Sequence, residues 1–382
     1  MTDARELELV SLAHARPGLT RAEAVRAVGL SSGRAVDVLG RLDTARLIAE
    51  RPAAASGRRG RPTTELVAHS DGPLVAAILL RHDSWQARVA ELGGAVVAEV
   101  ADEHDAATEP TLRAMAAALR RFRRRFGARI AAVAVAAPGV VRGGVLLQAS
   151  NLRWRNVDLR PLWPRPAVPV VAGNDATFAG WAERTRGAAR GYASALHLHV
   201  DSGLGGVYLA ADAPAPVDTD LGGEFGHMPF GDPRLACECG ARGCWDLMVD
   251  GRALARELGA REPRDPARYL TRRLADPAAR RALGVLARAL GRGAAGLVNA
   301  LDPGVVTLGG SAAELLAARA DAFEGAYLGG LMAFRRADPV PVVPATLGDT
   351  GTLVGAVEVG FARVLTRSGL DAWRTRSGRV GV

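Results

Sequence analysis

The first 50 residues contain three runs in which apolar side chains recur every three or four positions, a spacing typical of amphipathic helices. These runs predict helices over residues 5–15, 20–28 and 31–44. Glu23 follows Thr20 by three positions, so the second helix can begin with a capping box.

The third of these helices has Val36, Leu39 and Leu42 at helical spacing, and Ser31 or Ser32 can cap its start. A short turn with a glycine separates it from the second helix, and a strand-like run follows at residues 47–50. Two helices joined in this way and followed by a strand predict a winged helix-turn-helix.

Beyond Pro73 the pattern changes to strands, continuous apolar runs and longer helices. Strands are predicted over residues 74–80, 85–92, 95–100, 130–136, 168–172, 194–200, 207–210 and 305–308. Helices are predicted over residues 111–126, 175–186 and 279–301. Strands first, with mixed strands and helices later, indicate an α/β fold of two lobes with a ligand cleft between them.

Length and composition favour a globular protein of two or three domains, because the chain has 382 residues, 48% of them hydrophobic and 23% charged. We find no apolar run of 18 residues and no apolar signal core at the N-terminus, so we expect a cytoplasmic protein without a membrane segment. The net charge of +9 permits contact with nucleic acid. All 49 basic residues are arginine, as in proteins of GC-rich genomes, so a single arginine indicates less about function than usual.

The only cysteines of the chain, Cys237, Cys239 and Cys244, fall within eight residues, shortly after His227. Three thiolates and one imidazole make a closed tetrahedral set that suits structural zinc. Glycines among them allow turns tight enough to bring the ligands to one ion. The alternatives are three buried thiols without metal, or a disulfide that leaves one cysteine over. We therefore expect Zn²⁺ bound by His227, Cys237, Cys239 and Cys244.

The order Glu-x-Gly-His, from Glu224 to His227, followed by Cys-x-Cys-Gly-x-x-Gly-Cys, resembles the signature of the ROK family of sugar kinases and sugar-responsive repressors. The resemblance covers nearly the whole chain, and the chain is similar to xylose and N-acetylglucosamine repressors. It implies a winged helix-turn-helix followed by a two-lobed ROK domain of the actin/hexokinase-like, or ribonuclease H-like, α/β class. One departure is Asp246, where the family signature has glutamate.

The same resemblance implies a sugar pocket built from separated segments, because several fixed acceptors can pair the hydroxyls of a polyol. Its residues would be Asn151, Asn174, Asp175, Glu224, His227 and Asp246. Turn or helix-cap roles are the alternative for Asn151 and for the Asn174-Asp175 pair. Asp246 is one methylene shorter than the family's glutamate, which draws its carboxylate back by about 1.5 Å.

The N-terminal region resembles the DNA-binding head of ROK repressors, in which an Arg-Gly-Arg-Pro segment follows the wing. The third helix would enter the major groove of a double-stranded DNA operator. The candidate DNA contacts are Ser32, Arg34 and Arg41 on that helix and Arg58, Arg59 and Arg61 in the basic segment. A protein-interaction domain with a linker is the alternative.

ROK kinases hold nucleotide phosphates at an Asp-x-Gly-Gly-Thr turn after the first strand, and this chain lacks that turn. In an alignment on residues 89–94, Leu79 stands at the Asp position, Arg81 and His82 at the two Gly positions, and Asp83 at the Thr position. Without glycine the backbone cannot approach a phosphate closely. A second glycine-rich segment, residues 202–206, is retained in part. We therefore expect no catalytic residues and no enzymatic activity.

These observations favour a sugar-responsive transcriptional regulator of carbohydrate metabolism, and we expect it to be a repressor. By resemblance it would be a homodimer or homotetramer. We expect a DNA-binding domain at 1–68, a first lobe at 70–173, and a second lobe at 174–382 whose C-terminal helix returns to the first lobe. The main alternative is an active ATP-dependent sugar kinase with a fused DNA-binding domain. Another is a regulator that responds to a protein partner in place of a sugar.

Overall fold

The computed structural model describes residues 2–53, 64–165, 167–210, 212, 214–216 and 223–377, and only the backbone of Asn151. The chain forms two compact units. Unit 1 comprises Met1–Ala136, Asp158–Ala172 and Ala356–Val382, and unit 2 comprises Ala137–Val157 and Gly173–Gly355. Residues 137–157 thus group with the second unit and the C-terminal residues with the first, while the three-domain division given above stays a prediction.

Unit 1 begins with a small head, whose elements are α1 (Ala4–Ala15), α2 (Arg21–Val28), α3 (Ser32–Thr44), β1 (Ile48–Pro52) and β2 (Thr64–Ala68). Thr20 and Glu23 form the predicted capping box at the start of α2, which ends at Gly29 in the left-handed conformation with φ of 69°. Ser31 caps α3. Strands β1 and β2 pair antiparallel and form the wing.

Of the three apolar residues with helical spacing on α3, Leu39 and Leu42 are buried, whereas Val36 is 58% exposed. The buried residues of this helix are Ala35, Val38, Leu39 and Leu42, which follow the i, i+3, i+4, i+7 pattern. An α-helix has about 3.6 residues per turn, so Val36 lies about 100° around the helix axis from Ala35. Val36 therefore belongs to the predicted helix but lies outside its buried face.

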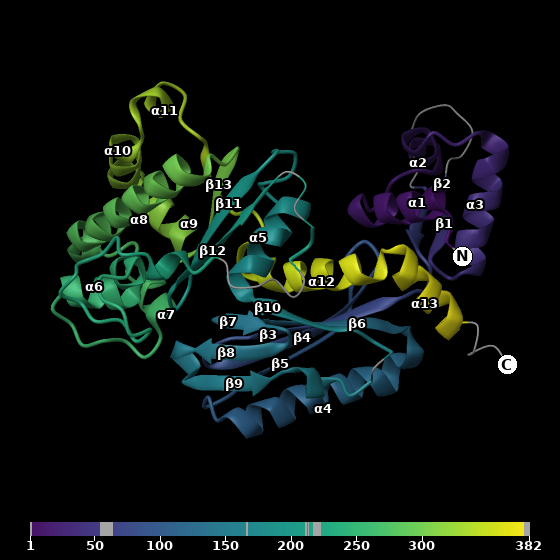
Figure 1. Ribbon diagram of the computed structural model, residues 1–382, viewed down its shortest axis with the longest axis horizontal. Coiled ribbons are helices and arrows are strands. Elements are labelled where there is room, and N and C mark those ends of the chain that lie inside the picture. Colours follow the sequence, from purple (N-terminus) through teal and green to yellow (C-terminus); the bar gives the residue numbers. More distant parts are fainter. Residues whose placement is uncertain are drawn as a thin grey trace. The chain divides into compact units, whose positions relative to one another are not determined.

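The rest of unit 1 is built on a five-stranded sheet with the strand order β10-β6-β3-β4-β5. Its strands are β3 (Leu74–Leu80), β4 (Ser84–Glu91), β5 (Val96–Glu103), β6 (Ile130–Ala137) and β10 (Val170–Asn174). Strands β3, β4 and β5 form an antiparallel meander, whereas β3 and β6 are parallel. Helices α4 (Thr108–Phe126) and α12 (Gly351–Val364) cover opposite faces of this sheet (Figure 1). Helix α13 (Arg367–Ser377) follows α12.

Unit 2 contains a three-stranded sheet of β7 (Val140–Arg142), β8 (Val145–Ala149) and β9 (Trp154–Asp158). A second sheet has the order β12-β11-β13-β14, with strands β11 (Ala195–Val200), β12 (Leu204–Leu209), β13 (Val305–Gly310) and β14 (Val342–Pro344). The helices of this unit are α5 (Asp175–Thr185), α6 (Gly251–Glu257), α7 (Pro266–Thr271), α8 (Arg280–Leu301), α9 (Ser311–Ala318), α10 (Ala320–Gly330) and α11 (Ala333–Ala337). Over the described part of the chain, no helix has the length and apolarity needed to cross a membrane.

Strand β12 begins earlier than predicted, at Leu204 in place of residue 207, so most of the glycine-rich segment is strand. Gly205 and Gly206 pair with His199 and Leu198 of β11. Glycine is needed there for close packing, because a Cβ on Gly205 would lie 2.8 Å from the Cβ of Ala176.

Candidate metal centre, sugar site and DNA-binding head

The four residues predicted to bind zinc come together in unit 2. His227, Cys237, Cys239 and Cys244 each offer one donor atom, and these atoms all lie within 4.8 Å of one another. The Cys237 Sγ lies 3.7 Å from the His227 Nδ1, and the Cys239 Sγ lies 3.7 Å from the Cys244 Sγ. A tetrahedral site with metal–sulfur bonds of about 2.3 Å separates its ligand atoms by about 3.8 Å. The donor set and its spacing therefore suit a bound metal ion.

The loop that carries the cysteines is held by its own backbone. The amide of Cys237 donates to the Ala241 carbonyl at 2.9 Å, and Arg242 donates from Nε to the Pro233 carbonyl at 3.1 Å. Gly240 and Gly243 have φ of 98° and 70°, a region that residues with a Cβ rarely adopt. Glycine between the ligands is therefore a requirement of the turn.

Glu224 lies directly beside this cluster. Its Oε2 is 3.8 Å from the Nε2 of His227, the ring nitrogen opposite the one that faces Cys237. A carboxylate on the far nitrogen of a metal-binding histidine fixes the ring and its tautomer. Burial raises the pKa of Glu224, and attraction to His227 offsets part of this rise. The sequence motif thus places a predicted metal ligand and a predicted sugar contact side by side.

Asp246 is buried, and both of its oxygens have protein partners. Oδ1 accepts a hydrogen bond of 2.5 Å from the backbone amide of Leu204, and Oδ2 lies 2.8 Å from Nη2 of Arg252. Arg252 also donates to Asp250 at 2.6 Å. In this geometry Asp246 joins the loop after the cysteines to the start of β12.

The first residues of β12 are the point at which the predicted sugar segments meet. A Cβ on Gly203 would lie 2.9 Å from Oδ1 of Asp246, and one on Gly206 would lie 3.0 Å from the ring of Phe225, which follows Glu224. Gly205 packs against Ala176, which follows Asp175. The structure therefore brings the neighbourhoods of Asp175, Glu224 and Asp246 to one short stretch of strand.

Asn174 acts as the N-cap of α5. Its Oδ1 accepts from the Thr177 amide at 3.0 Å, and its Nδ2 donates to the Gly139 carbonyl at 3.0 Å. This is the helix-cap role given above as the alternative to a sugar contact. Asp175 is half-buried in the first turn of α5, where its Oδ1 accepts from the Ala176 amide at 2.8 Å. The backbone of Asn151 lies in a single 3₁₀ turn, Ser150–Leu152.

The turn that would hold a phosphate in a kinase is a compact hairpin between β3 and β4. Leu79, at the metal-carboxylate position, is 2% exposed within β3. The amide of Arg81 donates to the Ser84 carbonyl at 2.8 Å, which closes the turn, and residues 81–84 include no residue with positive φ. This backbone has neither the glycines nor the carboxylate of a phosphate-binding turn.

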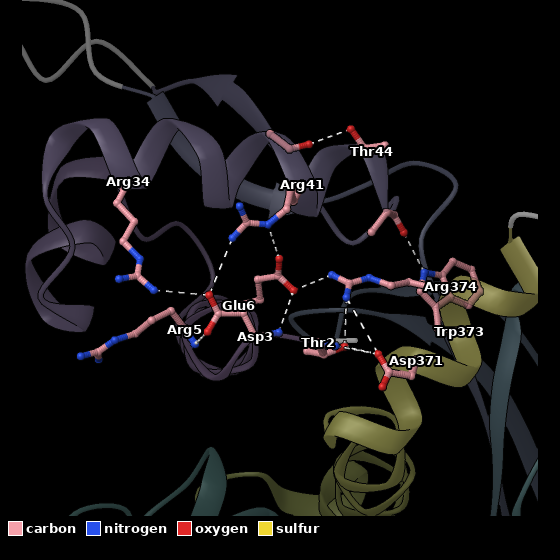
Figure 2. Close-up of polar contacts among 12 residues, drawn as sticks. Thr2, Asp3, Arg5, Glu6, Arg34, Arg41, Thr44, Asp371, Trp373 and Arg374 are labelled. Carbon is pink, nitrogen blue, oxygen red and sulfur yellow. Dashed lines mark hydrogen bonds and ion pairs between the residues drawn. The ribbon is translucent and has the colours of Figure 1, made fainter.

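Two of the candidate DNA contacts on α3 face acidic residues of α1 (Figure 2). Arg41 donates from Nε to Oε1 of Glu6 at 2.5 Å, and Arg34 Nη2 lies 3.6 Å from Oδ2 of Asp3. Ser32 is exposed in the first turn of α3. Arg58, Arg59 and Arg61 lie outside the described residues.

The C-terminal helix α13 also contacts the head, a relationship that the sequence patterns did not suggest. Arg374 donates to Oε2 of Glu6 at 2.6 Å, and Trp373 donates from Nε1 to the Ala45 carbonyl at 2.9 Å (Figure 2). Asp371 accepts from the hydroxyl of Thr2 at 2.7 Å. Helices α3 and α13 line a groove of 1190 Å³, and Val36 and Gly40 of α3 are among its lining residues.

Helix α12 makes a second, buried contact with the head. His14 accepts from the Gly93 amide at Nδ1, at 2.9 Å, so its Nε2 carries the proton that is donated to Glu358 of α12 at 3.1 Å. Both side chains of this pair are 7% exposed. A buried polar pair of this kind holds the two segments in one register, because separating them leaves each group without a partner.

Comparisons with known proteins agree with this architecture. A family model described as the ROK family matches residues 86–360. A glucokinase of Streptomyces coelicolor is 28% identical over 258 residues, 62% of this chain and 81% of the glucokinase. The xylose repressor of Bacillus subtilis is 29% identical over 133 residues, 34% of each chain. A solved ROK family transcriptional regulator, a homologue of the E. coli MLC protein, matches in fold with a TM-score of 0.75 over 98% of both chains, at 20% identity. The predicted fold class is confirmed, and the chain belongs to the ROK family.

Proposed function

We propose that this chain is a sugar-responsive transcriptional regulator of the ROK type, which binds operator DNA through its head and does not phosphorylate its sugar. The observation that carries the proposal is the head itself, a helix-turn-helix with a two-stranded wing that is bonded to both C-terminal helices. The glucokinase match covers 62% of this chain, whereas the regulator structure covers 98%. The head is the part that a kinase would not need.

In this proposal α3 enters the major groove with its outward face, on which Ser32 and Val36 are exposed. An exposed valine on a recognition helix suits contact with a thymine methyl group. Arg34 and Arg41 serve the phosphate backbone once their acidic partners release them, and Arg58, Arg59 and Arg61 add further phosphate contacts. A palindromic operator would match a homodimer or homotetramer of the chain.

The sugar would be held in unit 2. Asp175, Glu224 and His227 are the proposed direct contacts, because their segments converge on the start of β12. Asn151 is proposed as a further contact from the family resemblance. Asn174 and Asp246 support the site through the N-cap of α5 and the Leu204 amide. This assigns to Asp246 a positioning role, consistent with its shorter side chain.

We further propose that the metal at His227, Cys237, Cys239 and Cys244 is zinc, as the Cys₃His donor set suggests. A closed structural zinc site supplies rigidity and no reactive ligand position. His227 and the three cysteines would fix the loop, and Glu224 would be held by the Nε2 side of the His227 ring.

The route from sugar to DNA follows the chain. Helix α12 begins in unit 2 and continues into unit 1, where Glu358 is bonded to His14 of the head. A ligand that favours one arrangement of α12 would therefore bias the head, provided that its affinity differs between the two states. We propose that sugar binding lowers operator affinity, as in a repressor.

The experiment is a titration of labelled operator, obtained by in vitro selection, with purified protein and a panel of sugars. One sugar is expected to weaken operator binding severalfold in the native protein and not in Asp175→Asn. The control is Asp349→Asn, which removes an exposed carboxylate of the same unit. The proposal fails if no DNA is selected, or if every sugar leaves the affinity unchanged.

The second candidate is an active sugar kinase with a DNA-binding head. The similarity to glucokinase and the retained sugar-side residues favour this candidate. The closed β3–β4 turn, which lacks the glycines of a phosphate-binding turn, argues against it. Direct assay of phosphoryl transfer separates the two, as set out in the Discussion.

A further inference from the structure

Unit 1 contains a small basic pocket that is separate from the sugar and DNA sites. It has a volume of 290 Å³ and lies at the C-terminal end of α4, beside α13 and the segment before β10. Four arginines line it, Arg123, Arg124, Arg165 and Arg376, together with Trp163. No carboxylate is among the lining residues. These arginines come from three separate segments of the chain, so the pocket is assembled by the fold.

Two buried donors of this pocket have no partner. The Nε1 of Trp163, a residue 5% exposed, and the Nε of Arg376 are both buried without a hydrogen bond. Arg376 uses Nη1 to donate to the Ala167 carbonyl at 2.8 Å. Burial lowers the pKa of Arg376, in keeping with a guanidinium that has no acidic partner. Buried donors are nearly always paired in folded proteins, so unpaired ones point to a missing acceptor.

The charged residues around the pocket also indicate a missing acceptor. Across the residues that the structure describes, no carboxylate lies within ion-pair distance of the four arginines. Basic residues at a helix C-terminus interact favourably with the helix dipole, and this accounts for Arg123 and Arg124. The same explanation holds for Arg376 in the last turn of α13, but not for Arg165, which lies in no helix, nor for the unpaired Nε of Arg376.

We propose that this pocket binds a small phosphate-bearing anion. Planar guanidinium groups pair with phosphate oxygens in a bidentate manner, and four arginines are available for this. The volume is close to the lower end of the range of about 300–1,000 Å³ for small-molecule sites. It admits inorganic phosphate or a sugar phosphate, which share the group that the arginines recognise.

Occupation of this pocket would act on α13. Arg376 is two residues from Arg374, the residue of the same helix that is bonded to Glu6 of the head. An anion that joins Arg376 to Arg123 and Arg124 of α4 would tie α13 to the sheet layer. The proposal is independent of the sugar site and does not rest on the proposed function.

The test measures the melting temperature of the full-length protein at constant ionic strength while chloride is replaced by inorganic phosphate or by glucose 6-phosphate. A saturable rise is expected with at least one probe, and tighter saturation by glucose 6-phosphate would identify a sugar phosphate as the class of ligand. Arg124 and Arg165 are both exposed. The variants Arg124→Gln and Arg165→Gln should each weaken the rise in melting temperature with phosphate about tenfold. The control Arg121→Gln, an exposed residue of α4 outside the pocket, should leave it unchanged.

Two results would overturn the proposal. One is an equal response in all three variants, which would mark a non-specific salt effect or an adventitious ion only. The other is loss of DNA affinity in Arg124→Gln and Arg165→Gln with an unchanged phosphate response, which would make this surface part of the DNA interface.

Discussion

Glu6 of the first helix and Arg374 of the last helix are joined by a hydrogen bond of 2.6 Å, although 368 residues separate them. The other oxygen of Glu6 accepts from Arg41 of the proposed recognition helix at 2.5 Å. The Glu6 side chain is 3% exposed, so it has little access to solvent as a substitute partner (Figure 2). One buried carboxylate thus connects α3, the proposed recognition helix, with the C-terminal helix α13.

Glu6→Gln keeps the shape of this side chain and removes its charge. We expect the free energy of unfolding to fall by about 1.5–3 kcal/mol, the contribution typical of a hydrogen bond to a charged group. Glu8→Gln is the control, because Glu8 is half exposed and pairs only with Arg5, so the change should be at most about 1 kcal/mol. Urea unfolding followed by tryptophan fluorescence measures both. Equal effects of the two variants would show that Glu6 has no special role.

The same carboxylate predicts a dependence of stability on pH. Burial alone would raise the pKa of Glu6, but hydrogen bonds from Arg41 and Arg374 outweigh burial and lower the pKa below its ordinary value of 4.5. A depressed folded-state pKa means that this stabilisation is present in full above about pH 4.5 and is lost as the pH falls through the folded-state value. The difference in stability between the native protein and Glu6→Gln should therefore shrink on acidification. A constant difference down to pH 3 would contradict this assignment.

The sequence predicted most elements whose pattern is local. The capping box of Thr20 and Glu23, the strands of the first sheet and the long helix α8 all follow from apolar period and capping residues. Helical spacing alone did not show that Val36 is exposed, because residues 36, 39 and 42 satisfy it as well as the buried set 35, 38, 39 and 42. Only the packing of α3 on α1 decides between two such faces.

The contacts of α12 and α13 with the head could not be predicted, because nothing local marks a pairing between residues more than 300 positions apart. The convergence of His227 with the three cysteines could be predicted, since these four residues lie within 18 positions and form a set that suits zinc. The roles of Asn174 and Asp246 depend on backbone groups of Thr177 and Leu204, and the sequence does not show which amides lie in reach.

Metal analysis of purified protein should find one zinc per chain. Cys239→Ser should lose it and unfold at a lower temperature, because a structural zinc site contributes directly to folding. Glu238→Gln is the matched control, since Glu238 is exposed between two of the ligands and offers no donor to the cluster. A chelator should reproduce the effect of Cys239→Ser. Full stability in a protein without stoichiometric metal would contradict the zinc assignment.

DNA affinity should depend steeply on salt, because arginines displace counterions from phosphates. Changing Arg58, Arg59 and Arg61 to Ala is expected to weaken binding to all sequences and to reduce the slope of log K against log salt by about 2.7, or 0.9 for each phosphate contact. Arg113, Arg120 and Arg121 of α4, changed to Ala together, give a control with the same loss of charge. Similar reductions in both triple variants would show that only net charge matters.

Point variants are preferable to removal of the head. Trp373 is 2% exposed and Glu358 is 7% exposed in the intact chain, and both pack against residues of the head. Deletion of residues 1–68 should abolish DNA binding and also lower the stability of what remains, since it leaves a buried carboxylate without its histidine partner. Thermal unfolding of the truncated protein measures this. A truncated chain that melts at the native temperature would mean that the C-terminal helices do not depend on the head.

Phosphoryl transfer is the decisive reaction for the function of this chain. A kinase must fix its donor in line with the sugar hydroxyl and neutralise the phosphate charge with a metal ion and backbone amides. In the predicted alignment Leu79, a buried residue, stands at the position of the metal carboxylate. The β3–β4 turn is closed by the hydrogen bond from the Arg81 amide to the Ser84 carbonyl. We therefore expect sugar binding without ATP-dependent phosphorylation in a coupled assay over hexoses, pentoses and N-acetylhexosamines. Restoring glycine at positions 81 and 82 without Asp at position 79 should not create activity. Turnover of roughly 1–100 per second, the usual range of kinases, would overturn the regulator proposal if it disappears in Asp175→Asn and persists in Asp349→Asn.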